Sequence, residues 1–315
     1  MKLEDIKTIG VIGGGTMGHG IAINFALKDY PVIITDLNEQ ILQQSKANIH
    51  AALKLFAEEE LIDSAEAELA AGNITTTTDL KKVTAESDFI TEAIVERAAD
   101  KRDLFKTLDE ECPPQTILAS NTSWMVLADF TSGLKGQERM IITHYFAPPH
   151  IVPGVEVAGG SGTSPETYNL TCDLIKNIGK VPIKVLKESP GCLINRLQDV
   201  MRREANILWA EGVASAEDIE LGIISTCGFR MPHEGSMKHF DLAGMWQWPS
   251  DVLDAYAYRE ADEKSGLSPE NIERIRNRYA EGRPWFIDPE NFDEAIEARD
   301  RDFIRRLKAL YRKSP

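Results

Sequence analysis

Hydrophobic and polar positions change their periodicity near residue 188 of this chain. Before that point, short apolar runs bounded by turn residues alternate with longer segments in which apolar residues recur at helical spacing. The runs expected to form strands lie at 9–12, 32–35, 87–95, 116–123 and 140–149, around Glu156, and from 181 onward. Residues 74–80 are expected to form a short strand or a turn. Helices are expected at 21–27, 41–69, 100–111 and 125–134. This alternation predicts an α/β fold built on a doubly wound sheet.

The second part of the chain lacks strand patterns. After a Pro-Gly break beside Ser189, apolar residues recur at helical spacing in successive segments. These segments lie at 195–212, 215–226, 269–282 and 293–313. The change of period predicts two domains, an α/β domain at 1–188 and an all-helical domain at 189–315.

A glycine-rich turn separates the first predicted strand from the first predicted helix. Its glycines have GxGxxG spacing, and Asp36 ends the next strand, 18 residues beyond Gly18. In a Rossmann βαβ unit these glycines allow a tight turn and close approach of a pyrophosphate, while the acid accepts hydrogen bonds from the ribose. Asp36 would repel a 2′-phosphate, which favours NAD over NADP. The alternatives are a glycine-rich turn of another α/β protein and a solvent-facing acid. The residues expected at the cofactor are Gly13, Gly15, Thr16, Met17, Gly18 and Asp36.

Two ionisable residues stand in the apolar strands on either side of a proline-rich turn. His144 and Glu156 lie twelve positions apart in THYFAPPHIVPGVEV. A histidine beside a carboxylate is the simplest general-base pair, and the prolines would shape a turn that brings the second strand back beside the first. On these residues alone, a buried histidine with an unrelated strand glutamate is the slightly stronger interpretation.

Composition and charge narrow the class of protein. The formal net charge of −15 argues against nucleic acids and anionic membrane surfaces as partners, because both require clustered Lys and Arg. The four cysteines and six histidines show no metal-ligand spacing, so we expect free thiols and no metal site. No signal peptide or membrane-spanning apolar run is visible, and we expect a cytoplasmic protein.

Six motifs along the chain resemble the 3-hydroxyacyl-CoA dehydrogenase family. In order they are GGGTMGHGIA, EAIVER followed by Lys101, SNTS at 120–123, HYFAPPHIVPGVEV, SPGCLINR at 189–196 and AEGVASAEDIE at 210–220. The resemblance covers nearly the whole chain. Within the family, the PPHIVP turn, the GFRM segment and the charged tail are most similar to the branch containing L-gulonate 3-dehydrogenase (lambda-crystallin) and L-carnitine dehydrogenase.

The resemblance implies a role for each catalytic candidate. His144 would take the proton of the substrate 3-hydroxyl while a hydride passes to NAD, and Glu156 would hold the other ring nitrogen. Ser123 and Asn195 match the positions that hold the substrate oxygen. The structural alternatives are an ordinary loop serine for Ser123 and a helix N-terminal residue for Asn195.

The resemblance also extends the cofactor site and implies an assembly. Glu96, Lys101 and Asn121 match family positions at the nicotinamide end of NAD, although Glu96 and Lys101 also fit a surface ion pair across a helix start. Family members are dimers through the helical domain, so we expect a homodimer formed by this domain.

Several departures from the family pattern bear on the substrate. Ala147 replaces the usual asparagine after the catalytic histidine, and bulky Trp124 follows SNTS. The helix that is lysine-rich and contacts CoA in mitochondrial members corresponds here to the acidic stretch 56–69. Such a surface suits CoA phosphates poorly, which favours a small free 3-hydroxy acid. The alternatives are a dehydrogenase of short acyl-CoA thioesters and a catalytically silent, crystallin-like protein that binds the cofactor.

Overall fold

The computed structural model describes residues 1–253, 255 and 267–311 of the 315. The chain forms two compact units, Met1–Met201 and Arg202–Pro315. This division falls within helix α8 (Ile194–Ala210). The domain boundary expected near residue 188 stays a prediction.

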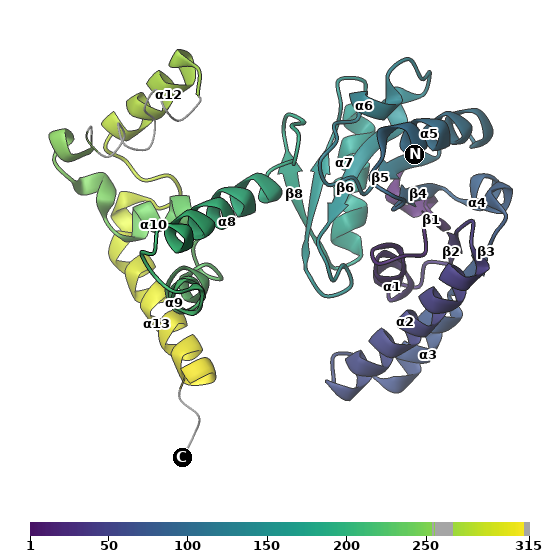
Figure 1. The fold of residues 1–315 in the computed structure, drawn as a ribbon, viewed down its shortest axis with the longest axis horizontal. Coiled ribbons are helices and arrows are strands. Elements are labelled where there is room, and N and C mark those ends of the chain that lie inside the picture. The colour runs from purple at the N-terminus through teal and green to yellow at the C-terminus, as the bar shows by residue number, and fades with distance from the viewer. Residues whose placement is uncertain (254, 256–266, 312–315) are drawn as a thin grey trace. The chain divides into compact units, whose positions relative to one another are not determined.

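An eight-stranded sheet forms the centre of the first unit (Figure 1). Its order is β3-β2-β1-β4-β5-β6-β7-β8. Neighbouring strands pair in parallel except β6 and β7, which are antiparallel. The strands are β1 (Ile9–Ile12), β2 (Val32–Thr35), β3 (Ile74–Thr77), β4 (Phe89–Glu92), β5 (Ile117–Ser120), β6 (Met140–Tyr145), β7 (Gly154–Ala158) and β8 (Val181–Val185). From β1 the chain adds β2 and β3 on one side of the sheet, and from β4 it adds the later strands on the other side. Doubly wound sheets bind their ligands at such a switch point, here between β1 and β4.

Helices cover both faces of this sheet and create two apolar cores. Alternate residues of a strand point to opposite faces, so Val11 and Ile12 belong to different cores. The first core includes residues of α1 (Gly18–Ala26), α2 (Glu39–Glu58) and α7 (Pro165–Asn177). The second includes residues of α4 (Leu80–Glu86), α5 (Ala98–Glu111) and α6 (Ala128–Thr131).

The predicted acidic helical segment is a hairpin of α2 and α3 (Ser64–Gly72). Asn38 caps α2 by accepting from the Gln40 N–H, and Asp63 and Glu66 form a reciprocal capping box on α3. Phe56 and Ala70 pack into the first core, while the glutamates at 58–60 are exposed. The strands lie where the sequence pattern predicts them, although three end early: β4 ends at Glu92 rather than near Glu96, β5 at Ser120 rather than 123, and β6 at Tyr145 rather than 149. Helix α7 is not among the predicted elements.

The second unit consists of helices, as the loss of strand periodicity predicts. Helix α8 enters it and is followed by α9 (Ala216–Gly222), a π-helical segment (Ile223–Gly228), α10 (Ser236–Leu242), α12 (Pro269–Ala280) and α13 (Phe292–Tyr311). The final two residues of the predicted last helix, 312 and 313, lie outside the described part. Asp241 is fully buried and accepts the backbone N–H groups of three consecutive residues, Trp285, Phe286 and Ile287. No helix among the described residues is both long enough and apolar enough to cross a membrane.

Candidate active site and cofactor cleft

The glycine turn after β1 has the geometry that a dinucleotide requires. Gly13 has a φ of +103°, and a Cβ there would lie 2.5 Å from the Ala93 carbonyl oxygen. A Cβ on Gly18 would lie 1.8 Å from the Gly13 carbonyl oxygen, so α1 can begin against the strand only with glycine. A Cβ on Gly15 would meet no atom within 4 Å, so there is open space where the pyrophosphate of a dinucleotide would pass.

Asp36 completes this turn from the end of β2. Its Oδ2 accepts the Gly14 N–H at 3.0 Å, and its Oδ1 accepts the Asn38 N–H at 3.2 Å. A cavity of about 630 Å³ lies beside it, lined by Gly13, Gly15, Asp36 and residues that follow β4. Thr16 is exposed in the turn, and Met17 precedes α1 half-buried. The residues present therefore fit an NAD molecule.

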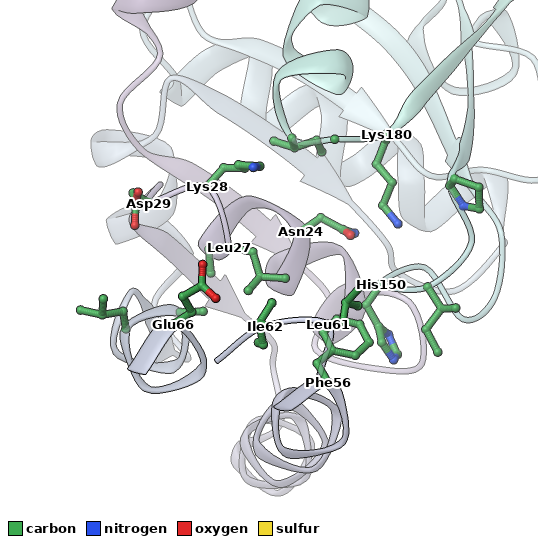
Figure 2. A pocket seen from close by; sticks show the side chains of 17 residues that line it. Asn24, Leu27, Lys28, Asp29, Phe56, Leu61, Ile62, Glu66, His150 and Lys180 are labelled. Atoms are coloured by element: carbon green, nitrogen blue, oxygen red, sulfur yellow. The ribbon is translucent and has the colours of Figure 1, made fainter. Parts of the chain in front are cut away.

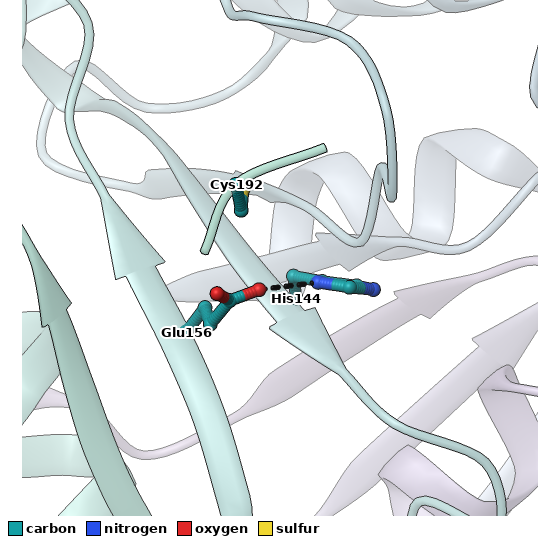
Figure 3. A group of neighbouring side chains, drawn as sticks. All are labelled: His144, Glu156 and Cys192. Carbon is teal, nitrogen blue, oxygen red and sulfur yellow. Dashed lines mark hydrogen bonds and ion pairs between the residues drawn. The ribbon is translucent and has the colours of Figure 1, made fainter. Parts of the chain in front are cut away.

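His144 and Glu156 are partners across the antiparallel strands β6 and β7. They occupy the same register position, and the His144 Nδ1 lies 2.7 Å from the Glu156 Oε2 (Figure 3). Both side chains are buried. Because an ionised carboxylate only accepts hydrogen bonds, Nδ1 carries the hydrogen in this pair. The other ring nitrogen, Nε2, points away from Glu156, as Figure 3 shows.

The second oxygen of Glu156 organises the start of helix α8. Glu156 Oε1 accepts the N–H groups of Leu193 and Ile194, each at 2.8 Å. A carboxylate at a helix N-terminus satisfies orphan N–H groups and complements the helix dipole. One carboxylate oxygen of Glu156 thus accepts from the histidine ring, and the other accepts from the start of α8.

Asn195, in the first turn of α8, lies beside the loop after β5. Its Nδ2 donates to the Ser123 carbonyl oxygen at 3.0 Å. Within the described residues, neither the Ser123 hydroxyl nor the Asn195 Oδ1 has a protein hydrogen-bond partner. The structure therefore brings together two of the residues predicted to hold the substrate oxygen.

Glu96 fixes the loop that carries Ser123. Its Oε1 accepts the Thr122 hydroxyl at 2.5 Å, the Ser123 N–H at 2.9 Å and the Trp124 N–H at 3.1 Å. Burial by itself would raise the pKa of Glu96. The hydrogen bond from Thr122, the charge of Lys101 and the two backbone N–H groups outweigh burial and hold that pKa below its usual value.

Lys101 is buried between two carboxylates, so it is not part of a surface ion pair. Its Nζ lies 2.6 Å from the Glu92 Oε1 and 3.2 Å from the Glu96 Oε2. Glu92 is fully buried and also accepts the Ile94 N–H and the Ser120 hydroxyl. Glu92 is not among the site residues expected from the sequence, although it ends an apolar strand just as Asp36 does.

Asn121 joins strand β5 to its neighbours. Its Oδ1 accepts the Tyr145 N–H at 2.9 Å, and its own N–H donates to the Glu92 carbonyl oxygen at 2.8 Å. The side chain thus ties the end of β5 to the end of β6, next to His144. Its predicted contact with the cofactor stays a prediction.

Cys192 lies beside the His144–Glu156 pair in the loop before α8 (Figure 3). The ligand atoms of these three residues lie within 4.8 Å of one another, the one such group among the described residues. Burial, together with the charges of Glu156 and Glu188, raises the pKa of the Cys192 thiol to about 12. A protonated thiol is a poor metal ligand, and Nδ1 and Oε2 are already bonded to each other. The expected absence of a metal stays a prediction.

The chain is similar in sequence to known proteins over most of its length. The family model of the 3-hydroxyacyl-CoA dehydrogenase NAD binding domain matches residues 8–189. Human mitochondrial hydroxyacyl-coenzyme A dehydrogenase is 34% identical over 245 residues, 76% of this chain and 77% of that protein. The L-carnitine dehydrogenase of Nocardiopsis dassonvillei is 30% identical over 308 residues, 98% of this chain and 92% of that protein.

A solved structure agrees over nearly the full length. The enzyme 5-formyl-3-hydroxy-2-methylpyridine 4-carboxylic acid 5-dehydrogenase, an NAD⁺-dependent dismutase, has a TM-score of 0.72 and 26% identity to this chain. The match covers 98% of this chain and all of that one. The similarity thus extends over both units.

Proposed function

The chain belongs to the 3-hydroxyacyl-CoA dehydrogenase family and is an NAD-dependent oxidoreductase acting on a CH–OH group, and on this premise we propose that it oxidises a small free 3-hydroxy acid to the 3-oxo acid with His144 as general base. The observation that carries the proposal is the 2.7 Å contact between His144 and Glu156, two buried side chains at one register position. When bound, NAD accepts the hydride released from the substrate carbon.

His144 performs the proton transfer in this mechanism. Glu156 holds Nδ1–H, so the lone pair of neutral His144 is on Nε2, which can accept the hydroxyl proton. The imidazolium that forms is stabilised by the adjacent carboxylate. In the reverse direction the same nitrogen returns the proton to the carbonyl oxygen.

Ser123 and Asn195 orient the reacting oxygen. The Asn195 amide has one N–H committed to the Ser123 carbonyl, which fixes the side chain and leaves a second N–H available as a donor. Donors of this kind stabilise charge that develops on the substrate oxygen. Glu96 holds the Ser123 loop, and its lowered pKa keeps it ionised at neutral pH.

The charge of the α2–α3 hairpin supports a free acid over a CoA thioester. Its tip carries exposed acids at Glu58, Glu59, Glu60 and Asp63. Their field disfavours the phosphates of CoA. Relatives over nearly the whole chain include L-carnitine dehydrogenases, whose named substrate is a free hydroxy acid.

A substrate panel tests the proposal. NADH formation is followed with L-gulonate, L-carnitine, L-3-hydroxybutyrate and 3-hydroxybutyryl-CoA, each with wild type and with His144→Ala. We expect turnover of at least one free acid, lost in the variant. Turnover of the thioester alone would make the chain a short-chain 3-hydroxyacyl-CoA dehydrogenase. Saturable NAD binding without turnover of any 3-hydroxy compound would support the silent, crystallin-like alternative.

We further propose that the protein forms a homodimer through α8. The helix has no buried residue among its 17, and large apolar side chains that share one face, at Leu197, Val200 and Ile207, are 39–58% exposed. Apolar surface on this scale is characteristic of protein interfaces.

A further inference from the structure

A second cavity in the first unit is separate from the cofactor cleft. It has a volume of about 570 Å³ and lies between α1, the α2–α3 hairpin, the proline-rich turn and the start of β8 (Figure 2). It shares no lining residue with the cleft beside Asp36. Neither His144 nor Glu156 lines it.

One wall of this cavity holds a buried ammonium group without a counter-charge. Lys180 is 8% exposed, and its Nζ donates to the Val152 carbonyl oxygen at 2.9 Å. Within the described residues, no carboxylate lies within ion-pair distance of it. An ammonium offers three donors, and a buried charge without a partner is costly. Burial accordingly lowers the pKa of Lys180 to about 8, so the amine is still largely protonated at neutral pH.

His150 lies on the same side of the cavity, as Figure 2 shows. Its Nδ1 is buried and has no hydrogen-bond partner. Burial, His19 and Lys180 together lower the pKa of His150. This nitrogen lies against Gly20 of α1, where an added Cβ would come within 2.7 Å of it, so the ammonium of Lys180 is the buried cationic group among the described residues that line the cavity.

The remaining walls are apolar in the middle and acidic at the far side. Leu27, Phe56, Leu61, Ile62 and Ile178 line the cavity, and Leu27 and Ile62 lie between the two ends in Figure 2. Asp29 and Glu66 lie on the side opposite Lys180 and His150 (Figure 2). Glu66 Oε2 is committed to the Asp63 N–H. The cavity thus offers a cationic end, an apolar middle and an acidic far side.

We propose that this cavity binds a small aliphatic carboxylate, with its head group on Lys180 and its chain along Phe56, Leu61 and Ile62. A carboxylate supplies the counter-charge that the Lys180 ammonium lacks, and a charge-assisted hydrogen bond is roughly twice as strong as a neutral one. The chain would cover the apolar walls that water contacts in its absence. This is a second acid-binding site, independent of the reaction proposed at His144.

Hexanoate is a suitable probe, with the uncharged isostere hexanamide as its control. Each is titrated at pH 7 into the protein saturated with NAD, and binding is followed by the NMR signal of the Lys180 ε-carbon. We expect saturable binding of hexanoate, at least about tenfold tighter than that of hexanamide, together with a rise of the Lys180 pKa toward 10.5.

Three variants locate the site. Lys180→Met should weaken hexanoate binding, measured by calorimetry, about tenfold or more. The matched control is Lys28→Met, at an exposed residue that also lines the cavity. This control should change hexanoate affinity less than about threefold. Leu61→Glu places a carboxylate on a wall residue that is 67% exposed, so the fold should tolerate it, and it should also weaken binding. Equal binding of hexanamide, wild-type affinity in both Lys180→Met and Leu61→Glu, or no saturable binding would overturn the proposal.

Discussion

At the scale of single residues, the geometry of the candidate site depends on the hydrogen bonds that Glu156 accepts. Glu156 accepts from the His144 ring with one oxygen and from two backbone N–H groups with the other. His144 is thereby fixed in tautomer and orientation. The family resemblance predicted this pair, whereas the two residues alone slightly favoured a buried histidine with an unrelated glutamate. The structure shows that they are in contact. The sequence did not predict the contacts to Leu193 and Ile194, since they join segments 37 and 38 residues apart.

Replacing the proposed base tests its role directly. His144→Ala should reduce kcat/KM by about 10²–10⁴-fold, because general-base catalysis contributes about that much. NAD affinity, measured by fluorescence quenching, should change little. His50→Ala, at an exposed histidine of α2, is the matched control and should behave as wild type. Near-full activity in His144→Ala would remove it from the mechanism.

Asp36 sets the predicted cofactor preference. Asp36→Ala should raise the KM for NAD and narrow the preference for NAD over NADP, because the carboxylate no longer accepts from the ribose or repels a 2′-phosphate. The comparison is the ratio of kcat/KM values with the two cofactors. Asp173→Ala changes an exposed acid far along the chain and should leave the ratio intact. If the ratio is unchanged in Asp36→Ala, Asp36 does not read the ribose.

At the scale of elements, the sequence predicted strands better than the groups at their ends. Strands β1 and β2 are buried on both faces, so their residues form short continuous apolar runs, and these runs predict where the strands lie. The end of β4 was placed too late, since Ala93, Ile94 and Val95 continue the apolar pattern after the ladder stops at Glu92. Helix α7 was missed although Ser164 and Pro165 form a standard helix start.

Glu92 joins β4, β5 and α5 through one buried carboxylate. Glu92→Gln should lower the free energy of unfolding by about 3 kcal/mol, at the low end for a broken buried ion pair because Glu96 still neutralises Lys101. Urea unfolding measures this difference. The matched variant Glu96→Gln concerns a side chain that is 36% exposed and should cost clearly less. Equal losses in the two variants would contradict the assigned role of Glu92.

At the scale of the whole molecule, the proposed assembly depends on the apolar face of α8 that carries Leu197, Val200 and Ile207. Val200→Glu should convert the dimer to a monomer, because a charge in a hydrophobic interface has no partner. Sedimentation analysis measures the mass. Gln198→Glu adds the same charge at an exposed position on the opposite side of the helix and should leave the dimer intact. A dimer that persists in Val200→Glu would exclude this face as the interface.

Glu156 accepts hydrogen bonds with both carboxylate oxygens, and this has a consequence for its replacement by glutamine. In Glu156→Gln, the carbonyl end of the amide must stay toward the Leu193 and Ile194 N–H groups, because an NH₂ there would oppose two donors. The NH₂ end would then face the ring and require Nδ1 to be the acceptor. His144 would carry its hydrogen on Nε2 and present a donor to the substrate hydroxyl. This almost isosteric change would thus exchange the donor and acceptor nitrogens of His144 while preserving the shape of the site. The ¹⁵N chemical shifts of the two ring nitrogens would reveal the exchanged tautomer.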